Sequence, residues 1–213
     1  MNKSESKIGV ILLAAGASTR YGNFPKQLLK INDKTLIRHA AQQALASSAQ
    51  TVCIVLGANF EIIKNEIEDL AVEIAVNENW ADGMSSSIKS GLKHLLNIEP
   101  NFSAVVLQLC DQPLVTNEIL NQLIQTHFET QKKIVASEYG QSFGVPALFE
   151  RELFEELLML NKETGAKSLI KKHENEAIFI NIPEAIFDID TREDYEKLIE
   201  SYKNTDSVLL SIL

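Results

Sequence analysis

Short apolar runs alternate with amphipathic stretches through the first 130 residues of the chain. The apolar runs are rich in Val, Ile and Leu and occupy residues 8–13, 52–56, 72–76 and 104–109. Runs of this length and composition are typical of strands buried on both faces of a sheet. Apolar residues recur at helical spacing over residues 37–45, 88–96 and 119–128. This alternation predicts an α/β fold that is built from βαβ units around a mainly parallel sheet.

The rhythm changes after residue 133. Strands are expected at residues 133–137, 145–149, 178–182 and 187–189, with helical stretches that begin at Arg151 and Gly165. The closing helix is expected to start at Thr191, because Thr-Arg-Glu-Asp has the spacing of a capping box. No repeat, low-complexity tract or Pro/Gly linker interrupts the chain. We therefore expect one domain over residues 1–202 and a C-terminal tail over 203–213. The apolar last residues of this tail, 208–213, are expected to pack back on the domain, with a subunit contact as the alternative.

The net charge, the length of the apolar runs and the cysteine content limit which kinds of partner the protein is expected to bind. The chain has 213 residues, enough for one well-buried domain, and its formal net charge of -9 argues against a nucleic-acid-binding face. The apolar run near the N-terminus is too short for a signal-peptide core or a membrane span. The two cysteines, Cys53 and Cys110, lie in apolar runs, so a disulfide framework is not expected. These features lead us to expect a cytoplasmic protein without a membrane or nucleic-acid partner.

The most informative segment, residues 12–28, follows the first apolar run. Gly16 and the alanines beside it let backbone N–H groups approach an anion closely. Arg20 and Lys26 add positive charge to the same loop. The segment matches neither the dinucleotide-binding pattern nor the P-loop pattern. An ordinary surface loop is the alternative, but glycines, hydroxyls and cations coincide just after a strand, where α/β proteins bind ligands. The segment therefore predicts a phosphate-binding loop.

Two further segments of the chain contain aspartates that are candidates for a ligand site. Asp111 comes directly after the run at 104–109, so it is expected at the same end of the sheet as the glycine loop. A carboxylate that faces a phosphate-binding loop requires a cation between them, and Mg²⁺ is the ion that oxygen ligands favour. Asp188 and Asp190 flank Ile189, and alternation along a strand would place both on one side. Asp190 alone is explained by the adjacent helix start. Paired with Asp111, it becomes a candidate for the second metal ligand.

The segment at residues 77–87 contains the chain's one tryptophan, Trp80, next to Asp82, Gly83 and a serine-rich helix start. The free N–H groups of such a helix start suit an anion or a polar ring edge. Simple capping by Asp82 or Ser85, with Trp80 in the core, is the alternative. Capping explains the serines but not a tryptophan among polar neighbours, so we expect this segment to contribute to a ligand site.

The run Leu13-Ala-Ala-Gly16-Ala-Ser18-Thr-Arg20-Tyr-Gly22, followed by Lys26, resembles the signature loop of molybdenum cofactor cytidylyltransferases and their nucleotidyltransferase relatives. The similarity continues in order through Asn79-Trp80, Gly83-Met84-Ser85-Ser86, Asp111-Gln-Pro-Leu, Gly144-Val-Pro-Ala-Leu-Phe, Gly165-Ala166 and Asp190-Thr-Arg-Glu-Asp-Tyr. The resemblance therefore covers nearly the whole chain. Tyr21, Cys110 and Val145 depart from the usual methionine, glycine and histidine, and the last change bears on the second substrate.

The resemblance implies a three-layer Rossmann-like nucleotidyltransferase fold and a site built from the segments above. In that site Lys26, Arg20 and Asp111 would be catalytic, and Asp111 and Asp190 would hold Mg²⁺. The nucleotide would be bound by Leu13, Ala14, Ala15, Gly16, Ser18, Thr19, Arg20, Lys26, Trp80, Asp82, Gly83 and Ser85.

The implied reaction is the transfer of CMP from CTP to the phosphate of molybdopterin, with release of pyrophosphate. Handing of the product to a molybdoenzyme or its chaperone is a further implied step. Ala15 favours CTP over GTP, because the guanylyl-transferring relatives carry glycine there and a methyl group narrows the space beside the base. A guanylyltransferase, a sugar-phosphate nucleotidyltransferase and a non-catalytic nucleotide-binding domain are the alternatives. The joint presence of Lys26, Asp111 and Asp190 argues against the last.

Overall fold

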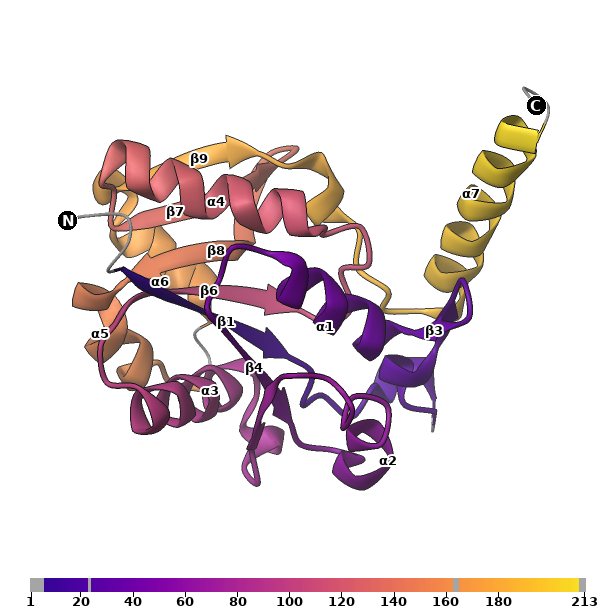
Figure 1. Ribbon diagram of the computed structural model, residues 1–213, viewed down its shortest axis with the longest axis horizontal. Helices are drawn as coiled ribbons and strands as arrows, with labels where there is room; N and C mark the ends of the chain where they lie inside the picture. Colours follow the sequence, from indigo (N-terminus) through magenta and orange to yellow (C-terminus); the bar gives the residue numbers. More distant parts are fainter. Residues whose placement is uncertain (1–5, 23, 163–164, 211–213) are drawn as a thin grey trace.

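The computed structural model describes residues 6–22, 24–162 and 165–210, and for residues 203–210 it gives the course of a helix only. A seven-stranded sheet of strand order β5-β4-β1-β6-β8-β7-β9 forms its centre (Figure 1). The strands are β1 (Lys7–Leu13), β4 (Thr51–Leu56), β5 (Glu73–Val76), β6 (Phe102–Leu109), β7 (Ile134–Tyr139), β8 (Ser142–Glu150) and β9 (Ala177–Asn181). Strand β8 runs antiparallel to β6 and β7, whereas every other neighbouring pair is parallel. The predicted mainly parallel sheet is confirmed.

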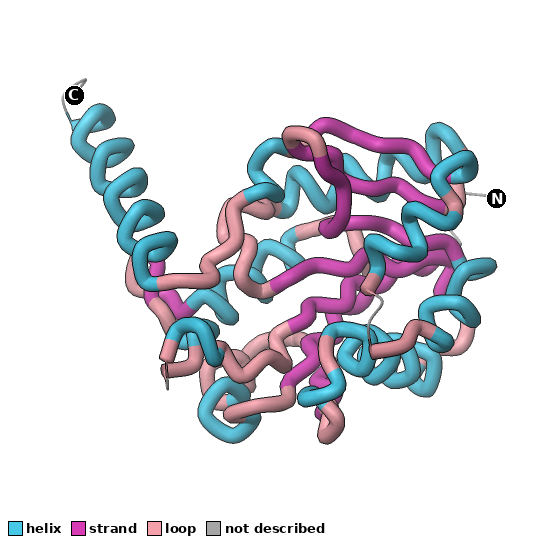
Figure 2. Tube along the Cα trace, turned by 180° about the vertical axis from the view of Figure 1, so that it is seen from behind, coloured by secondary structure: helices cyan, strands magenta, loops and turns pink. Residues whose placement is uncertain are grey.

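Helices cover both faces of this sheet. One face packs on α1 (Leu36–Ala46) and α4 (Asn117–Thr130). The other packs on α3 (Met84–Ile98), α5 (Phe154–Met159) and α6 (Ala166–Lys172), which Figure 2 shows from behind. Side chains alternate between the two layers along β6, so that Val106 belongs to the first core and Val105 and Leu107 to the second. The molecule is therefore a three-layer Rossmann-like α/β fold, as expected.

The parallel strands in the middle of the sheet bring their carboxyl ends together. Leu13, the last residue of β1, is paired with Leu109, the last residue of β6. Backbone hydrogen bonds extend this pairing into the loops, because Cys110 N donates to Leu13 O (3.1 Å) and Ala14 N donates to Val55 O (3.0 Å). The glycine loop after β1 and the segment after β6 are thereby fixed side by side.

Several short elements complete the fold. A hairpin of β2 (Lys30–Ile31) and β3 (Lys34–Thr35) precedes α1, and α2 (Phe60–Lys64) follows β4. Single-turn 3₁₀ helices lie at Thr19–Tyr21, Lys26–Leu28, Trp80–Asp82, Arg151–Leu153, Glu174–Glu176 and Pro183–Ile186. Within the described residues, no helix has the length and apolar character needed to cross a membrane.

The expected strand at residues 187–189 was wrong. Ile189 N donates to Asp111 O (2.9 Å), but the segment forms no ladder with a neighbouring strand in the described part of the chain. Burial of Ile189 ties the segment down instead, with no exposed surface on that residue. Asp188 and Asp190 still flank this buried side chain, and they lie close enough for the charge of Asp190 to raise the pKa of Asp188.

Helix α7 (Arg192–Leu210) closes the chain and extends away from the sheet (Figure 1). Its start confirms the predicted capping box: Thr191 N donates to Asp194 Oδ2 (2.9 Å) and Asp194 N donates to Thr191 Oγ1 (3.2 Å). The expected boundary between domain and tail, at residues 202 and 203, falls inside this helix. Side chains after Tyr202 lie outside the described residues, so the packing of the tail remains a prediction.

Candidate functional site

A cavity of about 370 Å³ opens at the carboxyl ends of β1 and β6. Residues from separate segments line it: the loop after β1, the Lys26 turn, the start of α3, the end of β6 and the approach to α7. It brings together most of the residues predicted from the sequence, namely Leu13, Ala14, Ala15, Gly16, Ser18, Thr19, Arg20, Lys26, Trp80, Gly83, Asp111 and Asp190. Its position agrees with the general rule that open α/β sheets bind ligands at the carboxyl ends of their strands.

The loop after β1 is held by a buried glutamine that sequence reasoning missed. The Gln27 side chain is 3% exposed, and its Nε2 donates to Ala14 O (3.0 Å) and Gly16 O (2.8 Å). Ser18 Oγ donates to Gln27 Oε1 (3.2 Å) and accepts a hydrogen bond from Lys26 N (3.1 Å). These bonds join the loop and the Lys26 turn into one unit. A glutamine next to a charged residue gives no sequence signal of burial, so only the fold reveals this role.

The backbone carbonyl groups of Ala14 and Gly16 bond to Gln27, whereas backbone N–H groups of the loop remain available to a ligand. Within the described residues, the N–H groups of Gly16, Ala17 and Ser18 form no backbone hydrogen bond. Ser18 takes the left-handed conformation (φ 57°), which reverses the chain before the turn at Thr19–Tyr21. Successive N–H groups in such a curved segment form a concave site for an anion.

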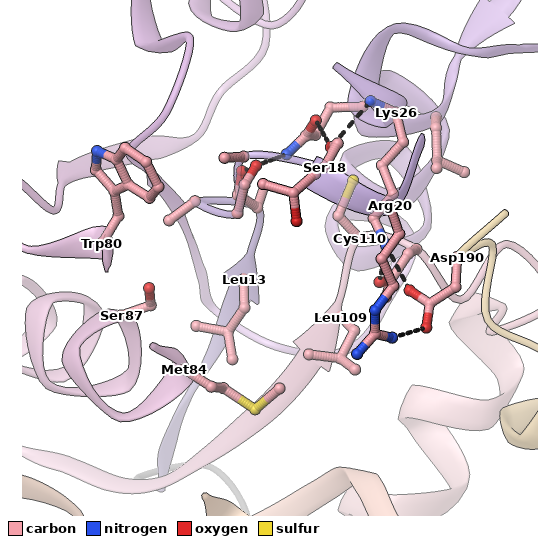
Figure 3. Close-up of a pocket in the computed structure, with 18 of the residues that line it drawn as sticks. Leu13, Ser18, Arg20, Lys26, Trp80, Met84, Ser87, Leu109, Cys110 and Asp190 are labelled. Carbon is pink, nitrogen blue, oxygen red and sulfur yellow. Dashed lines mark hydrogen bonds and ion pairs between the residues drawn. The ribbon is translucent and has the colours of Figure 1, made fainter. Parts of the chain in front are cut away.

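Cations and carboxylates meet at one end of the cavity, where Figure 3 shows Arg20, Lys26 and Asp190 together. Lys26 Nζ lies 2.6 Å from Asp111 Oδ2, 3.1 Å from Asp190 Oδ1 and 2.9 Å from Ile189 O. Arg20 Nη1 lies 2.9 Å from Asp190 Oδ2. Burial lowers the pKa of Lys26, but the ion pair with Asp111 and the hydrogen bonds to both aspartates outweigh it, so the pKa is raised and Lys26 stays charged.

Asp111 and Asp190 fit a hard divalent cation. Both place an oxygen within 3.1 Å of the same ammonium nitrogen, so the two carboxylates converge on one point. The other oxygen of Asp111, Oδ1, is buried and has no hydrogen-bond partner. The described residues contain no group of three or more His, Cys, Asp or Glu that could hold a metal by itself. Mg²⁺ commonly takes one or two carboxylates and completes its shell with phosphate oxygens and water, so two carboxylates suffice here.

Asp188 adds a third carboxylate close to this pair. Its pKa is raised to about 6, chiefly by burial and then by the negative charges of Asp111 and Asp190, whereas Gln112 and Lys26 act in the opposite direction. Three carboxylates therefore lie near one another at this end of the cavity, and a cation beside Asp111 and Asp190 would reduce the repulsion among them.

The opposite end of the cavity is less polar and is formed by Trp80, Met84 and Ser87 (Figure 3). Trp80 is 36% exposed, so the alternative that it belongs to the core is wrong. Capping by Asp82 or Ser85 is also wrong, because the N-cap residue of α3 is Gly83 (φ 90°), which has no side chain to form a capping hydrogen bond. An exposed aromatic ring at a cavity wall is suited to contact with a flat ligand group.

Gly57 allows Trp80 and Ala15 to pack closely against the backbone at this wall of the cavity. A Cβ at Gly57 would lie 2.6 Å from Trp80 Cβ and 2.9 Å from Ala15 Cβ, so no side chain fits there. Ala15 is 4% exposed and is held between the loop and this glycine. The width of the cavity beside Ala15 is therefore fixed by backbone rather than by movable side chains.

Asp82 and Ser85 do not line this cavity. The structure places them on a second cavity of about 560 Å³. Asp82 Oδ1 lies 3.3 Å from Lys162 Nζ there. The sequence placed both residues beside the nucleotide because they neighbour Trp80 and Gly83, but Trp80, Gly83 and Met84 line the first cavity, whereas Asp82 and Ser85 line the second.

Comparisons with known proteins agree with this geometry. A family model described as the MobA-like NTP transferase domain matches residues 10–177. Nicotine blue oxidoreductase of Paenarthrobacter nicotinovorans is 34% identical over 119 residues, an alignment that spans 55% of each protein. The chain thus matches about half the length of that relative.

Solved structures match over almost the full chain. The homologue of Mycobacterium tuberculosis Rv0371c from Mycobacterium sp. strain JC1 superposes with a TM-score of 0.81 at 29% identity, covering 93% of this chain and 98% of that one. Rv0371c from Mycobacterium tuberculosis H37Rv, in complex with manganese, gives a TM-score of 0.76 at 26% identity, with 92% and 100% covered. With the family model matched over most of the sheet and over the glycine loop, Lys26 and Asp111, the chain belongs to the MobA-like NTP transferase domain family.

Proposed function

We propose that this protein transfers CMP from CTP to the phosphate group of molybdopterin and releases pyrophosphate. The observation that carries the proposal is the meeting of Lys26, Asp111 and Asp190 at the end of a loop with free N–H groups. A binding module would need an anion-binding loop, but it would not need two converging carboxylates beside a buried lysine. The resemblance to cytidylyltransferases supports CTP and molybdopterin as the substrates.

The reaction needs no nucleophile from the protein. An oxygen of the acceptor phosphate attacks the α-phosphorus of CTP, the bond from the α-phosphorus to the bridging oxygen breaks, and pyrophosphate leaves with that oxygen. A phosphomonoester is largely ionised at neutral pH, so no strong general base is required. Catalysis then consists of holding the two phosphates in line and neutralising their charge.

Each cation has a defined place in this scheme. The N–H groups of Gly16, Ala17 and Ser18, with Arg20, would hold the β- and γ-phosphates. Lys26 would stabilise the charge that builds on the α-phosphate, for which its retained positive charge suits it. A divalent ion on Asp111 and Asp190, Mg²⁺ in our proposal, would supply charge neutralisation between the α-phosphate and the incoming phosphate. Local cations explain how a chain of net charge -9 can bind a polyanionic substrate.

The packing of the cavity wall at Ala15, Gly57 and Trp80 favours a nucleotide with a pyrimidine base over one with a purine. Because Gly57 admits no side chain, the Ala15 methyl group cannot move away from the cavity to make room for a purine. Steric exclusion of this kind contributes roughly 1–3 kcal/mol to discrimination, or about one to two decades in kcat/KM. We therefore expect CTP to be used in preference to GTP.

Pyrophosphate release with each nucleoside triphosphate, Mg²⁺ and molybdopterin tests the proposal, with a sugar 1-phosphate as the competing acceptor. The expected result is turnover with CTP and molybdopterin that requires the divalent ion. Preference for GTP would favour the guanylyltransferase alternative, and turnover with the sugar phosphate would favour the sugar-phosphate alternative. Absence of pyrophosphate with every pair would leave a non-catalytic binding domain or a different chemistry on the same fold.

Ala15→Gly should relax the preference for CTP over GTP by about one decade without changing the dependence on Mg²⁺. The control is Ala17→Gly, which removes a methyl group from the same loop and also lines the cavity. The measurement is kcat/KM for both nucleotides. An equal relaxation in the two variants would show that loop flexibility, rather than the wall beside Gly57, sets the preference.

A further inference from the structure

The second cavity, of about 560 Å³, is separate from the one assigned to the nucleotide, and the two share no lining residue. It lies along the first turns of α3, and Lys162, far from that helix in the sequence, lines it as well. Nothing in the proposed reaction uses it. Its chemistry therefore has to be explained separately.

The lining is cationic in a chain that is acidic as a whole. Lys89, Lys93 and Lys162 line the cavity together with one acidic residue, Asp82. Asp82 is paired with Lys162, at 3.3 Å between Oδ1 and Nζ. Lys89 and Lys93 form no hydrogen bond or ion pair with any other residue in the part of the chain that the structure describes. Their charge is not neutralised by the protein, so the field in the cavity favours an anion.

Helical spacing places the donors in one row. Ser85, Lys89 and Lys93 are four residues apart along α3, so they lie on the same face of the helix. The row begins in the first turn of a 15-residue helix, where backbone N–H groups lack partners within the helix and the helix dipole favours negative charge. Charge from the lysines and polarity from the helix end therefore act in the same direction.

Ser85 provides the independent observation that points to a ligand. It is 3% exposed, it lines the cavity, and its hydroxyl has no hydrogen-bond partner among the described residues. The adjacent serines are already engaged, because Asn77 Nδ2 donates to Ser86 Oγ (2.8 Å) and Ser87 Oγ (3.0 Å). Of these three serines, Ser85 is therefore the one whose hydroxyl is available to a ligand in the cavity.

We propose that this cavity binds a compact phosphate-type oxyanion, independently of the nucleotide. Ser85 donates hydrogen bonds to its oxygens from Oγ and from its backbone N–H, which has no backbone partner within the described residues, and Lys89 and Lys93 neutralise its charge. Lys162, which is paired with Asp82, adds a third positive charge to the lining. Charge-assisted hydrogen bonds of this kind favour phosphate and pyrophosphate over singly charged anions.

Amide NMR on the ¹⁵N-labelled full chain tests the proposal, with inorganic phosphate, pyrophosphate and chloride as separate titrants. Phosphate and pyrophosphate should give saturable shifts at Ser85, Ser86 and Lys89, and chloride should not. Pyrophosphate should also shift the amides of the loop at residues 16–19, which reports the nucleotide cavity separately.

The double variant Lys89→Gln/Lys93→Gln should weaken phosphate binding at the α3 amides roughly tenfold or more, and Ser85→Ala should weaken it as well. The matched control, Lys167→Gln/Lys171→Gln, removes two lysines at the same spacing from α6 and should leave the binding unchanged. Pyrophosphate shifts at residues 16–19 should persist in every variant. Absence of saturable shifts at the α3 amides, or equal weakening in the two double variants, would overturn the proposal.

Discussion

Asp111 presents two oxygens with different surroundings, one paired with Lys26 at 2.6 Å and one buried without a partner. Asp111→Asn keeps the volume of the side chain and removes its charge, so the fold should persist while the metal site is lost. We expect turnover to fall below about a tenth of the wild-type rate at saturating Mg²⁺, because a metal-bound carboxylate contributes several kcal/mol to the transition state. Steady-state kinetics measures the loss, and an unchanged thermal midpoint serves as its control. A rate above that limit would contradict the metal assignment.

Gln27 and Gln108 form a matched pair of buried glutamines. Gln27 donates to two loop carbonyls, whereas neither polar side-chain atom of Gln108 has a hydrogen-bond partner. Gln27→Met should lower the free energy of unfolding by about 1–3 kcal/mol, since Ala14 O and Gly16 O lose their donor. Gln108→Met should leave it unchanged or raise it, because it removes an unpaired amide from the core. Urea unfolding measures both.

Gln27→Met should also raise KM for the nucleotide, because the loop that holds the phosphates loses its conformation. Gln108→Met should not change KM. A loss of stability in Gln27→Met with an unchanged KM would show that the glutamine supports the fold without positioning the loop.

Among the elements, α7 begins next to the candidate metal ligand Asp190, so its cap matters for the site. Asp194 accepts hydrogen bonds from Thr191 N (2.9 Å) and Thr191 Oγ1 (2.7 Å). Asp194→Ala removes these bonds and should lower the free energy of unfolding by about 1 kcal/mol at pH 7. Urea unfolding of variant and wild type measures the difference.

The same variant should be sensitive to pH in a defined direction. Hydrogen bonds from the Thr191 side chain and backbone hold the pKa of Asp194 below its usual value of 3.8. A lowered pKa in the folded state contributes stability that is present above the unfolded pKa and is lost as pH falls through the folded pKa. The difference between wild type and Asp194→Ala should therefore shrink in acid. A difference that grows in acid would contradict the capping role.

At the scale of the whole molecule, burial in the core lowers the reactivity of both cysteine thiols. Cys53 and Cys110 are free and buried, and burial raises the pKa of Cys53 to about 12 and that of Cys110 further still. The thiolate is the reactive form, so neither cysteine should be alkylated by iodoacetamide at pH 8 in the native protein. Mass spectrometry should find both labelled once the chain is unfolded in urea. Fast native labelling of Cys110, which lines the cavity, would indicate that the cavity opens in solution.

The sequence determined the elements and the edge of the sheet at which the site lies. Strands β1, β4 and β6 are buried on both faces and form continuous apolar runs in the sequence, and the helices between them show their period directly. The run at residues 72–76 also forms a strand, but burial of both of its faces was wrong, because β5 lies at the edge of the sheet and Val76 is exposed. Since parallel strands end at one edge, the sequence by itself predicts that Gly16 and Asp111 lie close together. This information is local, because burial requires apolar residues at each position.

Tertiary structure decided which side chains meet. Lys26 contacts residues 85 and 164 positions further along the chain, and no local pattern encodes those distances. The same holds for the burial of Gln27, and for the division of residues 80–87 between two cavities, with Asp82 and Ser85 on the second. Residues 187–189 have the apolar pattern of a strand, yet the backbone of Ile189 bonds to the Asp111 carbonyl and to Lys26 Nζ instead of joining the sheet. Apolar patterning specifies burial, whereas polar contacts depend on the long-range geometry that burial creates.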